Sequence, residues 1–85
     1  MAIKIEDIVK TTCVIPYELD NGLHFALSIG TPGVVYDLDK EVARVEIKTS
    51  DIGDPEAQQA LRGDEGIYTE IALESLEVAQ PAQSA

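Results

Sequence analysis

Residues 17–29 read Tyr17-Glu18-Leu19-Asp20-Asn21-Gly22-Leu23-His24-Phe25-Ala26-Leu27-Ser28-Ile29. Asn21 and Gly22 favour the positive φ angles of a tight turn, which predicts that the two arms pair as a hairpin. After the turn, apolar side chains alternate with polar or small ones, a period of two that is typical of a strand with one buried face. The face expected to be buried carries Leu23, Phe25, Leu27 and Ile29. The fold is therefore expected to be built from antiparallel strands.

The segments around this hairpin have the same β character. Upstream, residues 7–15 are rich in β-branched side chains and end at Pro16, which predicts one strand in which Cys13 packs as a small hydrophobe. Downstream, Gly30-Thr31-Pro32-Gly33 is expected to be a turn. Strands are predicted over residues 34–38 and 42–48, joined by a polar turn at 39–41. In the second of these, the inward side chains are expected to be Ala43, Val45 and Ile47.

The chain changes character after Thr49. Asp54 as N-cap, Pro55 at the first helical position and Gly63 beyond the end predict a helix of two turns. A helix this short needs tertiary support, which we expect from Ala57 and Leu61. A strand is predicted over residues 67–73. Residues 74–78 fit a short turn with a closing strand, or a helical turn. The predicted domain spans residues 1–78, and residues 79–85 are expected to be a disordered tail.

Five short strands, one helix and no βαβ spacing predict a small antiparallel barrel, with the helix inserted before the last strands. The segments on which the likeness depends are Asp7-Ile8-Val9, Leu27 followed by Gly30-Thr31-Pro32-Gly33-Val34-Val35, residues 42–47, Tyr68-Thr69 and Leu76-Glu77-Val78. In this order they resemble the SH3-like barrels. The nearest kind is a short bacterial type with the pattern D-[IV]-V, G-T-x-G-x-V and a terminal L-x-V. Related barrels occur as KOW-type modules and in the β subunit of nitrile hydratase.

The resemblance covers most of residues 7–78 and implies a barrel that binds partners or completes a larger assembly. The chain departs from the short bacterial type in two segments. The hairpin from Tyr17 to Phe25 is long, and the insertion from Ser50 to Gly66 is acidic and partly helical. Since neither segment is needed to close a barrel, both are candidates for functional surface.

Composition limits the protein to one modest domain in water. The chain has 85 residues, of which 45% are hydrophobic, so folding buries roughly 60–65% of the unfolded surface. No run approaches the ~20 apolar residues of a membrane helix. Glu6 and Asp7 stand where a signal peptide would continue as an apolar segment, so we expect a cytoplasmic protein.

The formal net charge is −10, with 16 acidic and 6 basic residues. Because nucleic acids and anionic membranes are bound mainly through Lys and Arg, direct binding to either is not expected. The natural counterpart is a protein with a basic surface, although charge also serves solubility alone. From Ser50 to Val78 eight acidic residues oppose only Arg62, a net charge of −7. The residues predicted to bind the partner are Asp51, Asp54, Glu56, Asp64, Glu65, Tyr17 and Phe25.

The sequence offers few residues for a catalytic or metal-binding site. A single Cys13 and a single His24 make neither a thiolate cage nor a zinc site, and no base lies beside the cysteine in sequence. Asp37, Asp39 and Glu41 alternate along an extended segment, but the glycine and final glutamate of an EF-hand loop are missing. A solvated strand end is the preferred interpretation, with a calcium or magnesium site as the alternative. We expect no metal and no cofactor.

Three hypotheses for function follow. The favoured one is a non-catalytic protein-binding module, acting as an accessory or assembly subunit. The alternative is an acidic inhibitor of the phage or immunity type, which mimics nucleic acid in a basic cleft. A small enzyme or metal protein is the least favoured. Most of the four aromatics are expected in the core, although an SH3-like barrel could expose two tyrosines as a groove for a Pro-rich or extended peptide. The four are Tyr17, Phe25, Tyr36 and Tyr68. The partner and the oligomeric state stay open.

Overall fold

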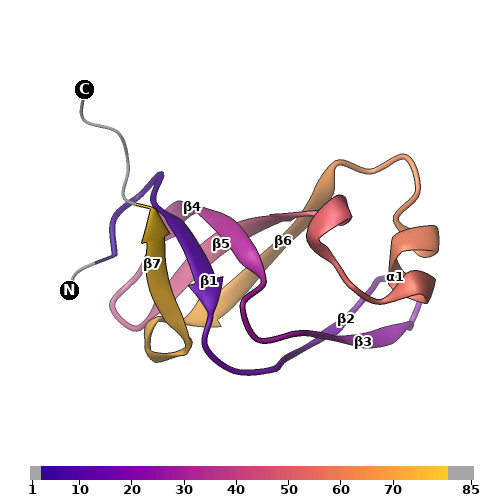
Figure 1. The fold of residues 1–85 in the computed structure, drawn as a ribbon, viewed down its shortest axis with the longest axis horizontal. Helices are drawn as coiled ribbons and strands as arrows, with labels where there is room; N and C mark the ends of the chain where they lie inside the picture. Colours follow the sequence, from indigo (N-terminus) through magenta and orange to yellow (C-terminus); the bar gives the residue numbers. More distant parts are fainter. Residues whose placement is uncertain (1–2, 81–85) are drawn as a thin grey trace.

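The computed structural model describes residues 3–80, and its largest element is an antiparallel sheet of five strands (Figure 1). The strands are β1 (Ile8–Thr11), β2 (Ile15–Glu18), β3 (His24–Leu27), β4 (Pro32–Leu38), β5 (Val42–Lys48), β6 (Gly66–Ala72) and β7 (Leu76–Gln80). Helix α1 (Pro55–Ala60) and the 3-10 turns η1 (Thr49–Asp51) and η2 (Leu73–Ser75) lie between them. Within residues 3–80 the protein is mainly β with one short helix, as the strand pattern predicts.

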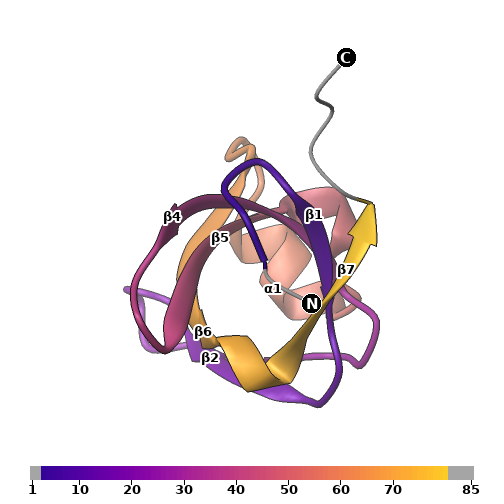
Figure 2. The same ribbon diagram turned by 90° about the vertical axis from the view of Figure 1, so that its left-hand side faces the viewer.

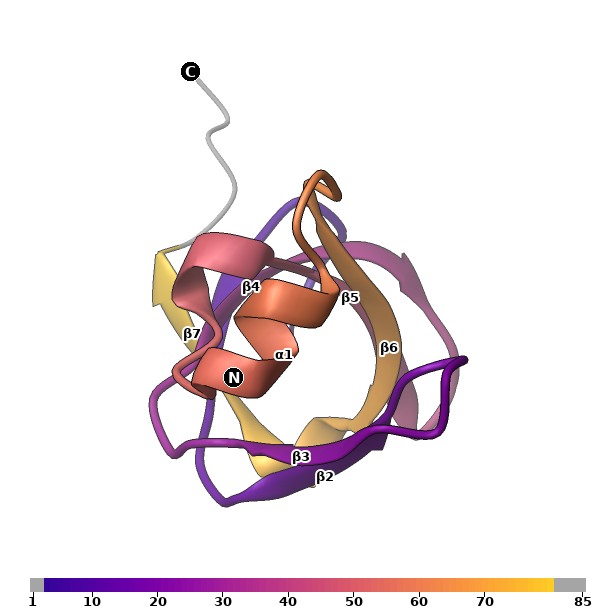
Figure 3. The same ribbon diagram turned by 90° about the vertical axis from the view of Figure 1, so that its right-hand side faces the viewer.

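The large sheet has the strand order β6-β5-β4-β1-β7, and β2 pairs with β3 in a separate two-stranded sheet. The large sheet is not closed into a barrel, since no pairing joins its end strands β6 and β7 in the described range. Turn η2 redirects the chain so that β7 pairs with β1. Figure 2 shows how strongly the sheet curves. Figure 3 shows α1 and the β2–β3 hairpin at one end of the curved sheet.

The core lies inside this curve and follows the predicted period of two. On β5 the side chains of Ala43, Val45 and Ile47 are buried, while Arg44 and Lys48 are exposed. The buried hydrophobic side chains contributed by the other strands are Val9, Phe25, Leu27, Val35, Ile67, Ile71 and Leu76. All of them belong to one cluster, so the described chain has a single core.

The predicted hairpin is confirmed. Gly22 has a φ of 89°, and the Asn21 side chain accepts a hydrogen bond of 2.9 Å from the Leu23 amide. Phe25 and Leu27 are buried as the alternation predicts. Ile29 was placed on the same face, and this was wrong: it is 67% exposed. The strand ends at Leu27 and the next turn carries Ile29 outward before the pattern can continue.

Two predicted segments before and after the hairpin have different bounds. The strand expected over residues 7–15 ends at Thr11, and the chain then turns toward β2. The Thr11 hydroxyl donates a hydrogen bond of 2.8 Å to the Ser28 carbonyl at this point. Cys13 lies in that turn and is exposed, so its predicted packing was wrong. β4 begins at Pro32, inside the expected turn, because Pro32 already pairs with Lys10 of β1.

The predicted helix is confirmed, and so is the residue that caps its N-terminus. It starts after Asp54, whose side chain accepts hydrogen bonds from the Glu56 and Ala57 amides. Ala57 and Leu61 are buried, which supplies the expected tertiary support. Gly63 has a φ of 95°, a conformation that glycine adopts without steric cost.

The C-terminal part resolves the two alternatives left open by the sequence. Residues 73–75 form η2, and the closing strand β7 follows. β7 continues two residues past the predicted boundary, because Gln80 pairs with Ile8. The remainder of the predicted tail, residues 81–85, lies outside the described residues. In the range 3–80 no helix is long and apolar enough to cross a membrane.

Candidate functional site

The acidic insertion forms one end of the molecule beyond β5 and β6 (Figure 1). Two hydrogen bonds from Thr49 hold its two ends together. The Thr49 amide donates a hydrogen bond of 3.1 Å to the Glu65 carbonyl, and the Thr49 hydroxyl donates one of 2.9 Å to the Asp64 carbonyl. The carboxylates of η1 and of the loop before β6 are therefore attached to ordered backbone. We call residues 49–65 the acidic end.

The acidic end is also fixed to the core from within. Ile52, Ala57 and Leu61 are buried in the hydrophobic cluster. The Gln58 side-chain amide donates to the Ile52 carbonyl, which joins α1 to the segment before it. Packing thus fixes the backbone from which the carboxylates project.

The predicted acidic residues differ in what they present to solvent. Asp51, Glu56, Asp64 and Glu65 are exposed. None of them takes part in the ion pairs found among residues 3–80. Asp54 is half-buried, and its Oδ1 accepts 2.9 Å and 3.2 Å hydrogen bonds from the amides of the first helical turn. The main role of Asp54 is therefore to cap the helix, and the other four residues supply the exposed negative charge.

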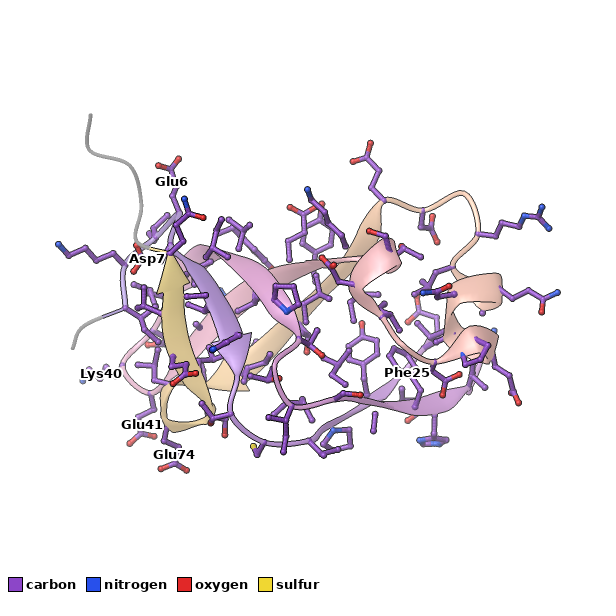
Figure 4. The ribbon with its side chains drawn as sticks, viewed as in Figure 1. Glu6, Asp7, Phe25, Lys40, Glu41 and Glu74 are labelled. Carbon is purple, nitrogen blue, oxygen red and sulfur yellow. The ribbon has the colours of Figure 1, made fainter. Side chains whose placement is uncertain are left out.

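The acidic stretch of residues 50–78 does not form a single face. Glu77 pairs with Lys10 across β7 and β1, with 3.2 Å between Nζ and Oε1. Glu74 lies beside Glu41 at the end of the sheet far from α1 (Figure 4). The net charge of −7 counted along the sequence is thus spread along the molecule, since Glu70 lies opposite Arg44 within the sheet, and only the residues before β6 gather at the acidic end.

The two predicted hairpin aromatics pack against each other. The rings of Tyr17 and Phe25 lie 5.5 Å apart at 56°, and they face each other across the β2–β3 register. Phe25 is only 7% exposed and Tyr17 is half-buried. Phe25 is part of the core, so its ring offers no surface to a partner in this conformation.

An exposed aromatic pair lies elsewhere, on the outer face of β4, β5 and β6. Tyr36 is 44% exposed and Tyr68 is 60% exposed. Their ring centroids are 5.4 Å apart and the ring planes meet at 87°. Tyr68 alternates with the buried Ile67 on β6, so its outward direction follows from the period of two. The alternation along residues 67–73 could have predicted that Tyr68 points outward. No pattern in the sequence indicates that Tyr36 of β4 contacts Tyr68.

Charged side chains surround this pair. Glu46 stands opposite Tyr68 in the β5–β6 register, and its charge and a hydrogen bond raise the pKa of the Tyr68 hydroxyl. The Arg44 guanidinium donates a 2.6 Å hydrogen bond to Asp37. That bond and the charge of Glu70 raise the pKa of Arg44. The outer face thus combines two aromatic rings with a carboxylate beside one of them and a cation already paired.

A shallow depression of about 450 Å³ lies at the border of the acidic end. Its lining residues are Glu46, Lys48, Thr49, Ser50, Asp64 and Glu65. Neither tyrosine lines it, but Glu46 does, and Glu46 also pairs with Tyr68 in the β5–β6 register. Glu46 is therefore the residue that the depression and the surroundings of Tyr68 share.

Other candidate chemistry is dispersed. His24 lies 3.8 Å from Glu18 on the exposed hairpin. The alternating carboxylates of residues 37–41 do not converge, since Asp37 is engaged with Arg44. Over residues 3–80 no group of three or more His, Cys, Asp or Glu side chains is placed to hold a metal ion.

Comparison with known proteins gives no relative from which a role could be transferred. No protein-family model, no curated protein and no solved structure matches this chain. Functional inference therefore depends on the surface just described.

Proposed function

We propose that this protein is a non-catalytic protein-binding module, an accessory or assembly subunit that docks through its acidic end onto a basic surface of its partner. The observation that carries the proposal is the anchoring of the exposed carboxylates. Asp51, Asp64 and Glu65 lie on backbone held by Thr49, and α1 is packed into the core through Ala57. A segment that is already ordered loses little conformational entropy when it binds. Electrostatic potentials that are complementary between the two proteins speed association and disfavour wrong partners.

An SH3-like architecture is part of this proposal. Apart from Leu27, which ends β3, the segments on which the resemblance depends fall on β1, β4, β5, β6 and β7 or directly before β1 and β4. These five strands are the ones that pair in the large sheet. The two departures, the β2–β3 hairpin and the acidic end, lie outside that sheet. Extra segments on a shared framework are where binding specificity usually resides.

The test compares two variants of equal net charge. The first neutralises the acidic end by replacing Asp with Asn and Glu with Gln at Asp51, Asp54, Glu56, Asp64 and Glu65. The control neutralises five exposed carboxylates elsewhere, namely Glu6, Glu18, Asp39, Glu41 and Glu74. Both variants have a formal net charge of −5, since each loses five of the ten excess charges. The difference between them therefore isolates where the charge lies.

The partner is first captured from cells of the native host with the wild-type chain, and its association is then followed by surface plasmon resonance. Neutralising the acidic end should slow association at low salt by about tenfold or more, while dissociation changes less. The control should associate at nearly the wild-type rate. Raising the ionic strength to physiological levels, where the Debye length is about 8 Å, should reduce the difference. Equal slowing of both variants would show that only net charge matters.

Competition separates the alternative function from the favoured one. If DNA or RNA displaced the chain from its partner, the acidic end would occupy a nucleic-acid cleft, as an inhibitor that mimics nucleic acid does. If neither displaced it, the partner's basic surface would be a dedicated protein-docking site. The five-residue variant would be slow to associate in both cases.

A further inference from the structure

The tyrosine pair lies on the outer face of the sheet, above strand β5. Tyr36 comes from β4 and Tyr68 from β6, which are separated by β5 in the sheet. Strands two places apart are about 9.6 Å from each other, whereas the two ring centroids are 5.4 Å apart. The rings therefore lean toward each other across β5. Because their planes meet at 87°, one ring keeps its flat faces accessible beside the other.

The pair presents a large aromatic surface to solvent. The two rings leave 44% and 60% of their residues' surface exposed. Aromatic side chains with one apolar face and a polar tip are favoured at interfaces, where they bring large contact area at low entropic cost. Glu46, which pairs with Tyr68 across β5 and β6, also lines the depression at the border of the acidic end.

The charges around the pair favour a cation. Glu46 lies directly across from Tyr68, and Glu65 is close enough to act on the same hydroxyl by its charge. Two cations of β5 stand two residues from Glu46: Arg44, which already donates to Asp37, and Lys48, which lines the depression with Glu46. No ion pair in the described part of the chain includes the Glu46 carboxylate. A guanidinium group can make two contacts with a ring face that lies beside such a carboxylate. It stacks on the ring face and donates hydrogen bonds to the carboxylate.

We propose that Tyr36, Tyr68 and Glu46 form a binding site for an arginine side chain of the basic partner. The guanidinium plate stacks on an accessible tyrosine ring and donates to the Glu46 carboxylate. Arginine fits better than lysine, because its planar, weakly hydrated group stacks on aromatic faces and donates in a fixed fork. The proposal rests on the proposed function, since it supplies the specific contact within a docking surface otherwise defined by charge.

The test uses a blocked peptide of alternating serine and arginine residues as the probe. It is titrated into the ¹⁵N-labelled 85-residue protein while amide chemical shifts are followed. Two companion peptides replace arginine with citrulline, which keeps the shape and removes the charge, or with lysine. The expected result is that shifts for the arginine peptide concentrate at residues around Tyr36, Glu46 and Tyr68. The lysine peptide should bind more weakly, and the citrulline peptide weakest of all.

Variants of Tyr68 identify the contribution of the ring. Tyr68→Leu should weaken binding of the arginine peptide roughly two- to fivefold, whereas Tyr68→Phe, which keeps the ring face, should retain most of the affinity. Glu46→Gln should weaken binding to a similar extent as Tyr68→Leu, and Glu18→Gln on the β2–β3 hairpin is its matched control. Thermal unfolding of each variant establishes that the fold is intact before affinities are compared.

The outcomes separate this site from the proposed function. If neutralising the acidic end abolished peptide binding while Tyr68→Leu left it unchanged, the arginine site would be refuted and charge-based docking would stand. If Tyr68→Leu weakened binding and neutralising the acidic end did not, the arginine site would stand alone. Equal binding of the citrulline and arginine peptides would refute the site, because the pair would then be a plain apolar contact. So would dimerisation of the free protein through this face.

Discussion

Gly66 provides the sharpest test of how the acidic end is joined to the sheet. It is the first residue of β6 and pairs with Lys48 at the end of β5. A Cβ added at this position would lie 2.3 Å from the Ile47 carbonyl oxygen, 3.0 Å from its carbonyl carbon and 3.1 Å from the Lys48 Cα. All three atoms belong to the backbone, so no side chain can move aside. In Gly66→Ala the two strands must separate where the acidic end begins.

The cost follows from that geometry. Overpacking a well-packed site costs about 1–3 kcal/mol, and separating the strands weakens at least one ladder hydrogen bond, worth about 1 kcal/mol. We therefore expect Gly66→Ala to lower the free energy of unfolding by at least about 2 kcal/mol. For a domain of this size each 1 kcal/mol corresponds to about 4–8 °C, so Tm should fall by about 8–16 °C.

Thermal and urea unfolding followed by circular dichroism measure this effect, with Gly53→Ala as the matched control. Gly53 lies in the same insertion, but a Cβ there would have no atom within 4 Å and its φ is not positive. Gly53→Ala should therefore be neutral or stabilise by up to about 1 kcal/mol through the unfolded chain. If Gly66→Ala unfolded within about 2 °C of wild type, the close approach of β5 and β6 would be wrong, and so would the fixed position of the acidic end.

Two further predictions concern the helix cap and the aromatic pair. Asp54→Ala should cost about 1 kcal/mol, because the amides of Glu56 and Ala57 lose their acceptor, while Asp54→Asn should unfold near the wild-type temperature; equal melting of both variants would contradict the cap. Tyr68 has a raised pKa in the folded state, so its neutral phenol favours folding, and that contribution is present below pH 10 and lost as pH rises through the folded pKa. In an alkaline titration at 295 nm, Glu46→Gln should lower the midpoint for Tyr68, and an unchanged midpoint would mean that Glu46 does not act on this hydroxyl.

Local sequence signals determined the elements of this protein. The hairpin depends on Asn21 and Gly22, and the helix on Asp54 and Pro55, all of which act within about four residues through turn and capping geometry. The alternation on β5 selected the correct buried face because the period of a strand is independent of its neighbours. The acidic residues of the insertion were likewise recognisable as a candidate surface from their number alone.

Only the tertiary structure decided which of these residues meet. Cys13 lies in the turn that follows Thr11, and the Thr11 hydroxyl donates a hydrogen bond to the carbonyl of Ser28, 17 residues away. The pairing of Tyr36 with Tyr68 requires the register of three strands, and no local pattern specifies a register. The acidic stretch looked continuous along the chain, yet β6 carries the chain from the acidic end to Glu74 at the other end of the sheet. Propensity acts over a few residues, whereas a surface is assembled by strand pairing and packing across the whole chain, so the sequence could supply the charges but not their arrangement.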